Sequence, residues 1–152
     1  RSLWPMLNYL EELQPGETSS LTEGVKSFCL RNSGKGIVVL ISDLMDKGGY
    51  EAALRYLLAQ DLDIYVIHLL STAEIEPDLQ GDLRLIDCED GDVAEITVTA
   101  PLMTRYQNTL KAFLQTAREF CTRRGIAYLF TRNDVPVEQL MTGYLRQRGL
   151  VR

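Results

Sequence analysis

The residues best placed for chemistry follow a strongly apolar stretch in the first third of the chain. Residues Ile37 to Ile41 are all apolar and mostly β-branched, and Ser42 and Asp43 end the run. A run of this kind is typical of a strand that helices cover on both faces. Ligands of open α/β sheets gather outside the carboxyl ends of the strands, so Asp43 is a candidate for cation or substrate binding. A carboxylate that only caps the next turn is the other interpretation.

An enzyme or phosphorelay protein is an alternative for the same region. Asp43, Asp46 and Lys47 share features with a phosphoacceptor site, so an Asp-based phosphoacceptor or hydrolase on a doubly wound α/β fold is a second hypothesis. Such a site expects an acidic pair after an earlier strand and a lysine after a later one. The stretch 131–134 has no lysine where one is expected, so we favour a noncatalytic protein.

Other reactive side chains are few and scattered. His68, the only histidine, lies inside an apolar run, and Cys29, Cys88 and Cys121 share no metal-ligand spacing with it. We therefore expect a core histidine and reduced thiols, as is usual in a cytoplasmic protein.

Composition narrows the classes of partner. The chain has 152 residues and a formal net charge of −5, without a long Lys/Arg cluster, which argues against nucleic acid. It has neither a secretory signal nor a continuous apolar stretch of the roughly 18 residues that a membrane helix requires. We expect a cytoplasmic chain with no membrane insertion of this segment.

Hydrophobic periodicity predicts an alternation of helices and strands with one interruption. Helical spacing of apolar residues alternates with short β-branched runs, and a strand, a crossover helix and a second strand predict parallel pairing. An Asp-Gly turn joins two short strands into an inserted β-hairpin. Helices are expected around 4–13, 21–31, 50–60, 102–124 and from Pro136 onward, parallel strands at 37–41, 63–70 and 126–131, hairpin strands at 83–87 and 95–99, and a loop at 72–81.

Taken together, these segments resemble a known family. The segments are VVLISDLMD with the following Gly-Tyr, HLLSTAEIEP, GDLRLIDCEDG, CTRRGIAYLFTRND and YLRQRGL, in this order over nearly the whole chain. They resemble the second half of a von Willebrand factor A-type domain, and more narrowly the bacterial family catalogued as domain of unknown function fifty-eight. The resemblance implies a three-layer Rossmann-like, mostly parallel sheet that is incomplete and carries the hairpin. Residues 1–152 would then be a single partial domain.

The resemblance also implies where a cation would bind. A-type domains hold a divalent ion with a DxSxS run after the first strand, a threonine in a later loop and an aspartate after the fourth strand. Asp43 matches the aspartate, and Thr18 or Ser19 matches the threonine. The DxSxS run is missing, and the chain opens on Arg1, so we expect a fragment without the first strands. We expect no cofactor and no metal site in this fragment, whereas Mg²⁺ or another divalent cation would suit the intact domain.

The resemblance finally implies a protein partner. The family commonly accompanies MoxR-type AAA+ ATPases, so a noncatalytic interaction or scaffold module working with such an ATPase is expected. In the parent fold the first strand lies beside residues Ile37 to Ile41, and its absence leaves an apolar strand at a sheet edge. We expect this edge to pair with a second copy as a homodimer or to be covered by the N-terminal helix.

Overall fold

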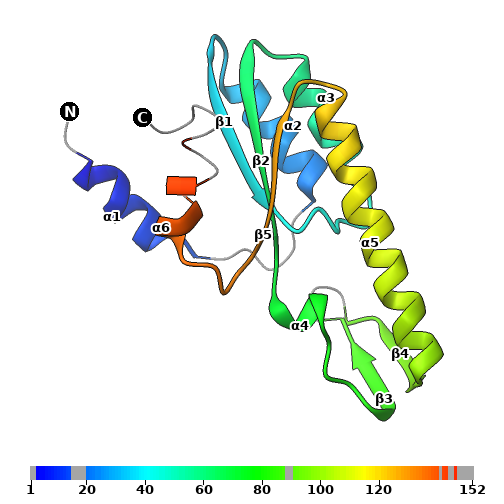
Figure 1. Cartoon of the computed structure of the whole chain (residues 1–152). Coiled ribbons are helices and arrows are strands. Elements are labelled where there is room, and N and C mark those ends of the chain that lie inside the picture. The colour runs from blue at the N-terminus through cyan, green and yellow to red at the C-terminus, as the bar shows by residue number, and fades with distance from the viewer. Residues whose placement is uncertain (1–2, 15–19, 88–90, 141, 144–145, 147–152) are drawn as a thin grey trace.

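The main element of the fold is a three-stranded parallel sheet (Figure 1). The computed structural model describes residues 3–14, 20–87, 91–140, 142–143 and 146. Within them, β1 (Gly36–Ser42) pairs with β2 (Leu62–Leu70), which pairs with β5 (Ala127–Arg132). The order is β1-β2-β5, and Val39 lies opposite Tyr65 in the parallel register. The predicted α/β class and the parallel pairing of these strands are confirmed.

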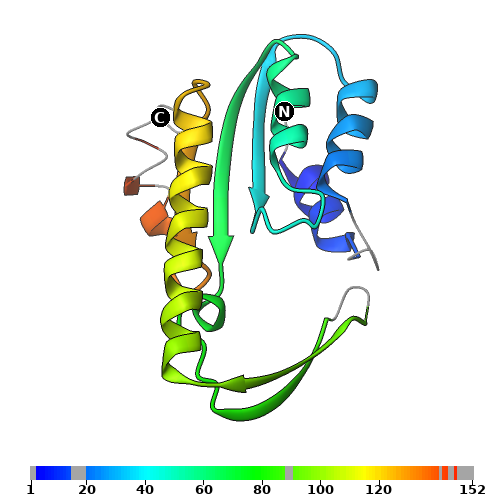
Figure 2. The same ribbon diagram turned by 90° about the vertical axis from the view of Figure 1, so that its right-hand side faces the viewer.

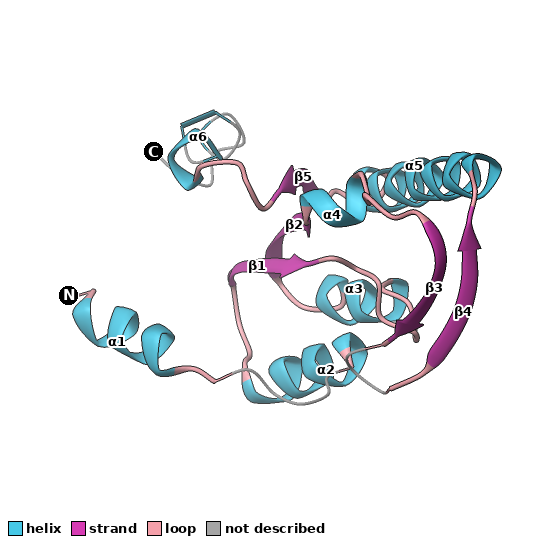
Figure 3. Cartoon of the chain, turned by 90° about the horizontal axis from the view of Figure 1, so that it is seen from below, coloured by secondary structure: helices cyan, strands magenta, loops and turns pink. Residues whose placement is uncertain are grey.

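Three helices lie on one side of this sheet, two of them against the strands and one against a neighbouring helix. They are α2 (Leu21–Arg31), α3 (Glu51–Leu58) and α5 (Ala100–Thr122), and they lie together on one side in Figure 3. Their apolar stripes meet alternate residues of the strands, which is the two-residue period of a pleated strand against the helical period. The resulting core contains Val25, Leu44, Tyr50, Ala53, Leu54, Leu57, Ile64, Val66, Ala117, Phe120, Cys121, Ile126 and Tyr128.

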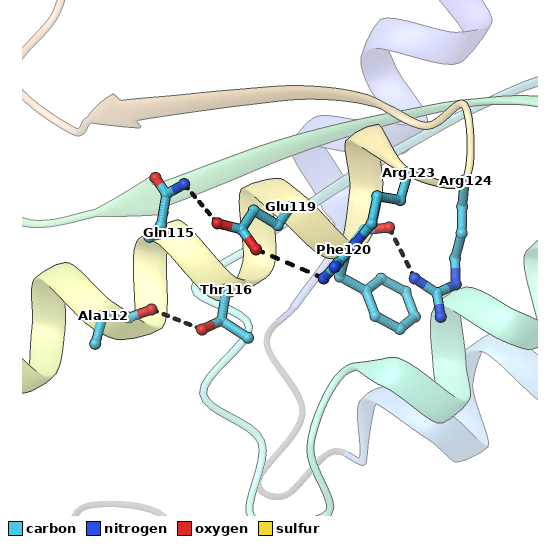
Figure 4. A network of polar contacts seen from close by, with 7 residues as sticks. All are labelled: Ala112, Gln115, Thr116, Glu119, Phe120, Arg123 and Arg124. Atoms are coloured by element: carbon cyan, nitrogen blue, oxygen red, sulfur yellow. Dashed lines mark hydrogen bonds and ion pairs between the residues drawn. The ribbon is translucent and has the colours of Figure 1, made fainter.

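Polar contacts between neighbouring turns order the C-terminal end of α5 (Figure 4). The Arg124 guanidinium donates to the Phe120 carbonyl at 3.1 Å and stacks over the Phe120 ring at 3.7 Å from its centroid. One turn earlier, Glu119 accepts from Gln115 and pairs with Arg123. Cations favour the negative end of the helix dipole, so these arginines stabilise the end of the helix.

On the opposite face of the sheet, β1 has no covering helix among the described residues, and here the sequence interpretation was wrong. Ile37, Val39 and Ile41 are 59%, 41% and 61% exposed, although a strand of this composition was expected to be covered on both faces. The reason is that α2, α3 and α5 pack on one side only, and α1 (Trp4–Glu12) buries none of its residues. The N-terminal helix therefore does not cover the Ile37–Ile41 edge. We call this surface the open face, formed by Ile37, Val39, Ile41, Tyr65, Ile67, Leu69, Ala127 and Leu129.

The predicted β-hairpin forms a sheet of its own between β2 and α5. β3 (Gly81–Ile86) pairs antiparallel with β4 (Val93–Val98), and Figure 2 shows the hairpin extending beyond the carboxyl ends of the main strands. At its turn the Asp87 amide donates to the Asp92 carbonyl at 2.8 Å, and residues 88–90 lie outside the described part.

The loop predicted at 72–81 contains a short helix, α4 (Thr72–Ile75). Ser71 and Glu74 form a capping box in which each side chain accepts from the backbone amide of the other residue. This reciprocal cap satisfies two amides that would otherwise lack partners, so it stabilises a single turn. The Tyr106 hydroxyl donates to the Glu74 carbonyl and joins α4 to α5.

The last predicted helix is observed over one turn as α6 (Val137–Leu140). Tyr144 and Leu145, which we expected to face inward, lie outside the described residues. Among the helices described for this chain, none has the length and apolar character needed to cross a membrane.

Candidate functional site

The candidate site lies where β1 and β2 end and the chain turns toward α3. Ser42, the last residue of β1, is in register with His68 of β2, and Asp43 follows it. The Asp43 side chain is exposed, and its Oδ1 accepts from the Met45 amide at 2.9 Å. This contact is the turn-capping arrangement that short acidic side chains favour.

The next residue, Leu44, has a backbone conformation that is unusual for a leucine. Its φ angle is 59° and its side chain is 1% exposed, within the core. Its amide donates to Ser42 Oγ at 3.0 Å. A left-handed conformation costs a non-glycine residue on the order of 1 kcal/mol or more, so surrounding contacts must hold it. The loop after β1 is therefore fixed in shape.

Asp46 connects this loop to the start of α2. Its Oδ2 accepts from the Leu21 amide and its Oδ1 from the Gly48 amide, both at 2.6 Å. Ser20 caps the same helix by accepting from the Glu23 amide at 3.4 Å. Both carboxylate oxygens of Asp46 are thus engaged in satisfying backbone donors.

The carboxylates of Asp43 and Asp46 do not by themselves provide enough ligands for a divalent cation. A hard cation such as Mg²⁺ or Ca²⁺ requires about six oxygen ligands. Within the described segments, no group of three or more His, Cys, Asp or Glu side chains could hold a metal ion. Asp43 is brought to the strand end as predicted, whereas the two other candidates, Thr18 and Ser19, lie outside the described residues.

Lys47, a residue of the alternative phosphoacceptor hypothesis, contacts the hairpin. The Lys47 ammonium lies 3.1 Å from Asp92 and 3.9 Å from Asp87, the residues that flank the turn of the hairpin. At the end of β5, Arg132 pairs with Asp134 instead of offering a free cation to the site. Lys47 therefore joins the loop after β1 to the hairpin.

His68 is a core residue, as the sequence suggested. Its side chain is 0% exposed, and its Nδ1 lies 2.8 Å from the Tyr128 hydroxyl. The imidazole meets the rings of Phe113, Tyr128 and Phe130 edge-on, with centroids 5.6 to 5.8 Å away. Burial lowers the pKa of His68, and the backbone and charge of Asp43 oppose this only in part. His68 Nε2 has no hydrogen-bond partner among the described atoms.

The two described cysteines, Cys29 and Cys121, lie in different surroundings. Burial raises the pKa of the Cys121 thiol to about 11, with only a small opposing effect of Arg124. Cys29 is half-buried in α2, and its thiol lies 3.8 Å from the Tyr56 carbonyl. Cys88 lies outside the described residues. A thiol that remains protonated at neutral pH is a poor nucleophile, so Cys121 serves packing.

A groove that the sequence did not reveal runs between α2 and β1. It encloses about 520 Å³, and we call it the α2–β1 groove. Most of its wall is apolar, and its polar groups gather where β1 ends. Only the tertiary arrangement creates it, because α2 packs on α3 and leaves the space beside β1 open. Its lining comprises Ser20, Leu21, Gly24, Val25, Phe28, residues 38–43, Met45, Asp46 and Leu57.

Comparison with known proteins gives one match. The family model described as "Protein of unknown function DUF58" matches residues 1–118. The comparisons with curated proteins and with solved structures found no match.

Proposed function

The chain belongs to the DUF58 family of proteins of unknown function, and we propose that it is a noncatalytic protein-interaction or scaffold module. The observation that carries this proposal is the open face. Parallel sheets are almost always covered on both faces, and contiguous exposed apolar surface marks interaction sites. Here Ile37, Val39 and Ile41 form a row of large apolar side chains that face solvent.

The resemblance to a von Willebrand factor A-type domain supports the same proposal. The parallel strands with helices on one face agree with an incomplete version of that fold, in which strand-end loops recognise other proteins. By the same resemblance, the proposed partner is a MoxR-type AAA+ ATPase in the cytoplasm. In an intact domain, Asp43 together with Thr18 or Ser19 would contribute to a divalent cation site.

The test is binding to a purified MoxR-type AAA+ ATPase from the same source, measured by isothermal titration calorimetry. We expect Ile41→Lys to weaken binding by about tenfold or more, because a charge then replaces buried apolar contact. Leu30→Lys is the matched control, since Leu30 is 88% exposed on α2, outside the open face.

Equal binding by the native chain and Ile41→Lys would remove the open face from the proposal. Complete absence of binding by the native chain would remove the ATPase as its partner.

A further inference from the structure

The edge of the sheet that lies farthest from β1 is formed by β5. β5 pairs with β2 on one side, and none of the described strands pairs with its other side. The order β1-β2-β5 places β2 between the two edges, so this edge does not depend on what pairs with β1. Residues 127–131 contain neither a charge nor a proline, the residue types that commonly block pairing at a sheet edge. β5 is therefore able to accept a further strand.

A groove runs along this edge between α5 and β5. Its larger part encloses about 620 Å³ and an adjoining part about 290 Å³, and we call the whole the α5–β5 groove. Figure 3 shows β5 at the margin of the sheet with α5 beside it. The lining comprises Lys111, Leu114, Gln115, Arg118, Thr122 and residues 125–130. The groove is thus built entirely from α5, the turn that follows it and β5.

The charged side chains of the α5–β5 groove are both cations. Lys111 and Arg118 are exposed, and neither has an ion-pair partner among the residues that the structure describes. None of the described residues that line the groove is acidic, although the chain as a whole has a formal net charge of −5. The two cations are two helical turns apart, about 10 Å along the axis of α5, and share one face of it. A ligand that carries carboxylates finds both cations available.

Apolar surface lies between the two cations. Leu114 is half-buried on α5, Tyr128 is 8% exposed and Phe130 is half-buried. The Tyr128 hydroxyl lies 2.8 Å from His68 Nδ1, and the Phe130 ring meets the imidazole edge-on. Because the core already fixes both rings, an apolar side chain that binds here orders few protein groups.

We propose that the α5–β5 groove binds an extended acidic segment of a partner protein, which adds to β5 as a further strand. The inference rests on the proposed interaction function and specifies a second surface for it. Main-chain hydrogen bonds supply affinity in this mode of recognition, and alternate side chains supply specificity. Side chains on one face of a strand recur about every 6.8 Å. The helix-facing side of the segment therefore carries an acid, an apolar residue and a second acid at alternate positions, so that the acids pair with Lys111 and Arg118 on either side of Leu114.

The other candidate occupants carry the wrong charge. Residues 141–152 of the chain contain three arginines and no acidic residue, so they would bring like charge to Lys111 and Arg118. A second copy that paired β5 with β5 about a two-fold axis would bring the same two cations of both copies to one interface. Charge complementarity therefore favours a separate acidic segment over either of these.

The experiment titrates the chain with a synthetic peptide of threonines with glutamate, valine and glutamate at alternate positions. The control peptide has lysine in place of each glutamate. Amide hydrogen exchange locates binding, and isothermal titration calorimetry measures affinity. We expect the glutamate peptide to slow exchange within residues 127–131 and to bind more weakly as salt is added, and the lysine peptide to do neither.

Arg118→Glu is the blocking variant, and Arg105→Glu is its matched control. Arg105 is also exposed on α5 but lies outside the groove, so both variants change the net charge equally. We expect about a tenfold loss of affinity for the glutamate peptide in Arg118→Glu and little change in Arg105→Glu. The double variant Lys111→Glu, Arg118→Glu should instead bind the lysine peptide, which a variant that merely failed to fold would not do.

Unchanged exchange in residues 127–131 with the glutamate peptide, or equal affinity of the native chain and Arg118→Glu, overturns the inference. Protection of these amides before peptide is added assigns the edge to the chain itself or, with a dimer mass in light scattering, to a second copy, and also overturns it. ATPase binding that Ile41→Lys weakens, without any peptide binding, overturns the groove and leaves the proposed function intact. Peptide binding without ATPase binding supports the groove and removes only the ATPase.

Discussion

The two faces of the main sheet carry similar side chains in different surroundings. On the helix-covered face, Val66 and Leu70 are buried, whereas Ile37 and Ile41 on the open face are more than half exposed. Both sets are aliphatic and belong to neighbouring parallel strands. Hydrophobic stabilisation depends on area removed from water, so equal composition gives unequal contributions to the free energy of unfolding. The covered face stabilises the fold, whereas the row of Ile37, Val39 and Ile41 remains in contact with solvent.

A pair of truncations tests this contrast most strongly. Leu54→Ala removes a side chain that is 0% exposed, and we expect a loss of about 2 to 5 kcal/mol in the free energy of unfolding. Ile41→Ala removes a side chain that is 61% exposed, and the expected loss is under about 1 kcal/mol. Urea denaturation of both variants measures the difference. Similar losses would show that the open face is buried in solution.

Lowering the pH should reduce the free energy of unfolding through His68, which lies on the helix-covered face. Burial lowers the pKa of His68 in the folded chain below its ordinary value of 6.5, so the unfolded chain binds the proton first as the pH falls. The contribution of neutral His68 to the free energy of unfolding is complete above about pH 6.5. Below that pH the free energy of unfolding falls, by at most about 1.4 kcal/mol per pH unit for one proton.

The measurement is the free energy of unfolding between pH 7.5 and about 5, taken from urea curves in the native chain and in His68→Asn. The groups facing the imidazole are Tyr128, Asp43 and Glu74. We expect the variant to be less stable at neutral pH and to have a shallower dependence on pH. Parallel curves for the two proteins would contradict the role assigned to His68.

The smallest expected effect concerns Asp43 and Asp46, the two acids that follow β1. Asp46→Ala removes the acceptor of two amides, those of Leu21 and Gly48, and should cost about 1 kcal/mol. Asp43→Ala removes one exposed contact to the Met45 amide and should cost less than about 0.5 kcal/mol. Thermal unfolding of the two variants gives the comparison. A larger loss for Asp43→Ala would indicate that its carboxylate has a structural partner.

Local patterns were sufficient for most of the elements. The apolar spacing from Leu21, the Ser20 cap and the β-branched runs predicted α2, β1 and β2 because their determinants lie within each segment. The single turn of α4 was missed, since it depends on the capping box of Ser71 and Glu74 more than on an apolar stripe. Coverage of β1 was mispredicted, because composition does not report which helices reach a face.

The candidate site was predictable only in part. Asp43 was found because a strand end is visible in the sequence, and His68 because its neighbours are apolar. The contact of His68 with Tyr128 joins residues 60 positions apart and follows from the pairing of β2 with β5. The α2–β1 groove arises from the packing of α2 on α3. Neither arrangement could be predicted from a pattern within a single segment of the sequence, because each depends on residues far apart in the chain.

The edge of β1 that pairs with no described strand also bears on the behaviour of the chain when it is heated. Short uncharged β-branched stretches without proline are the usual seeds of cross-β stacking, and Ile37 to Ile41 is such a stretch. Once thermal fluctuations detach neighbouring segments, identical stretches from different molecules can stack faster than each molecule refolds. Melting should therefore be irreversible, with an apparent midpoint that rises with scan rate.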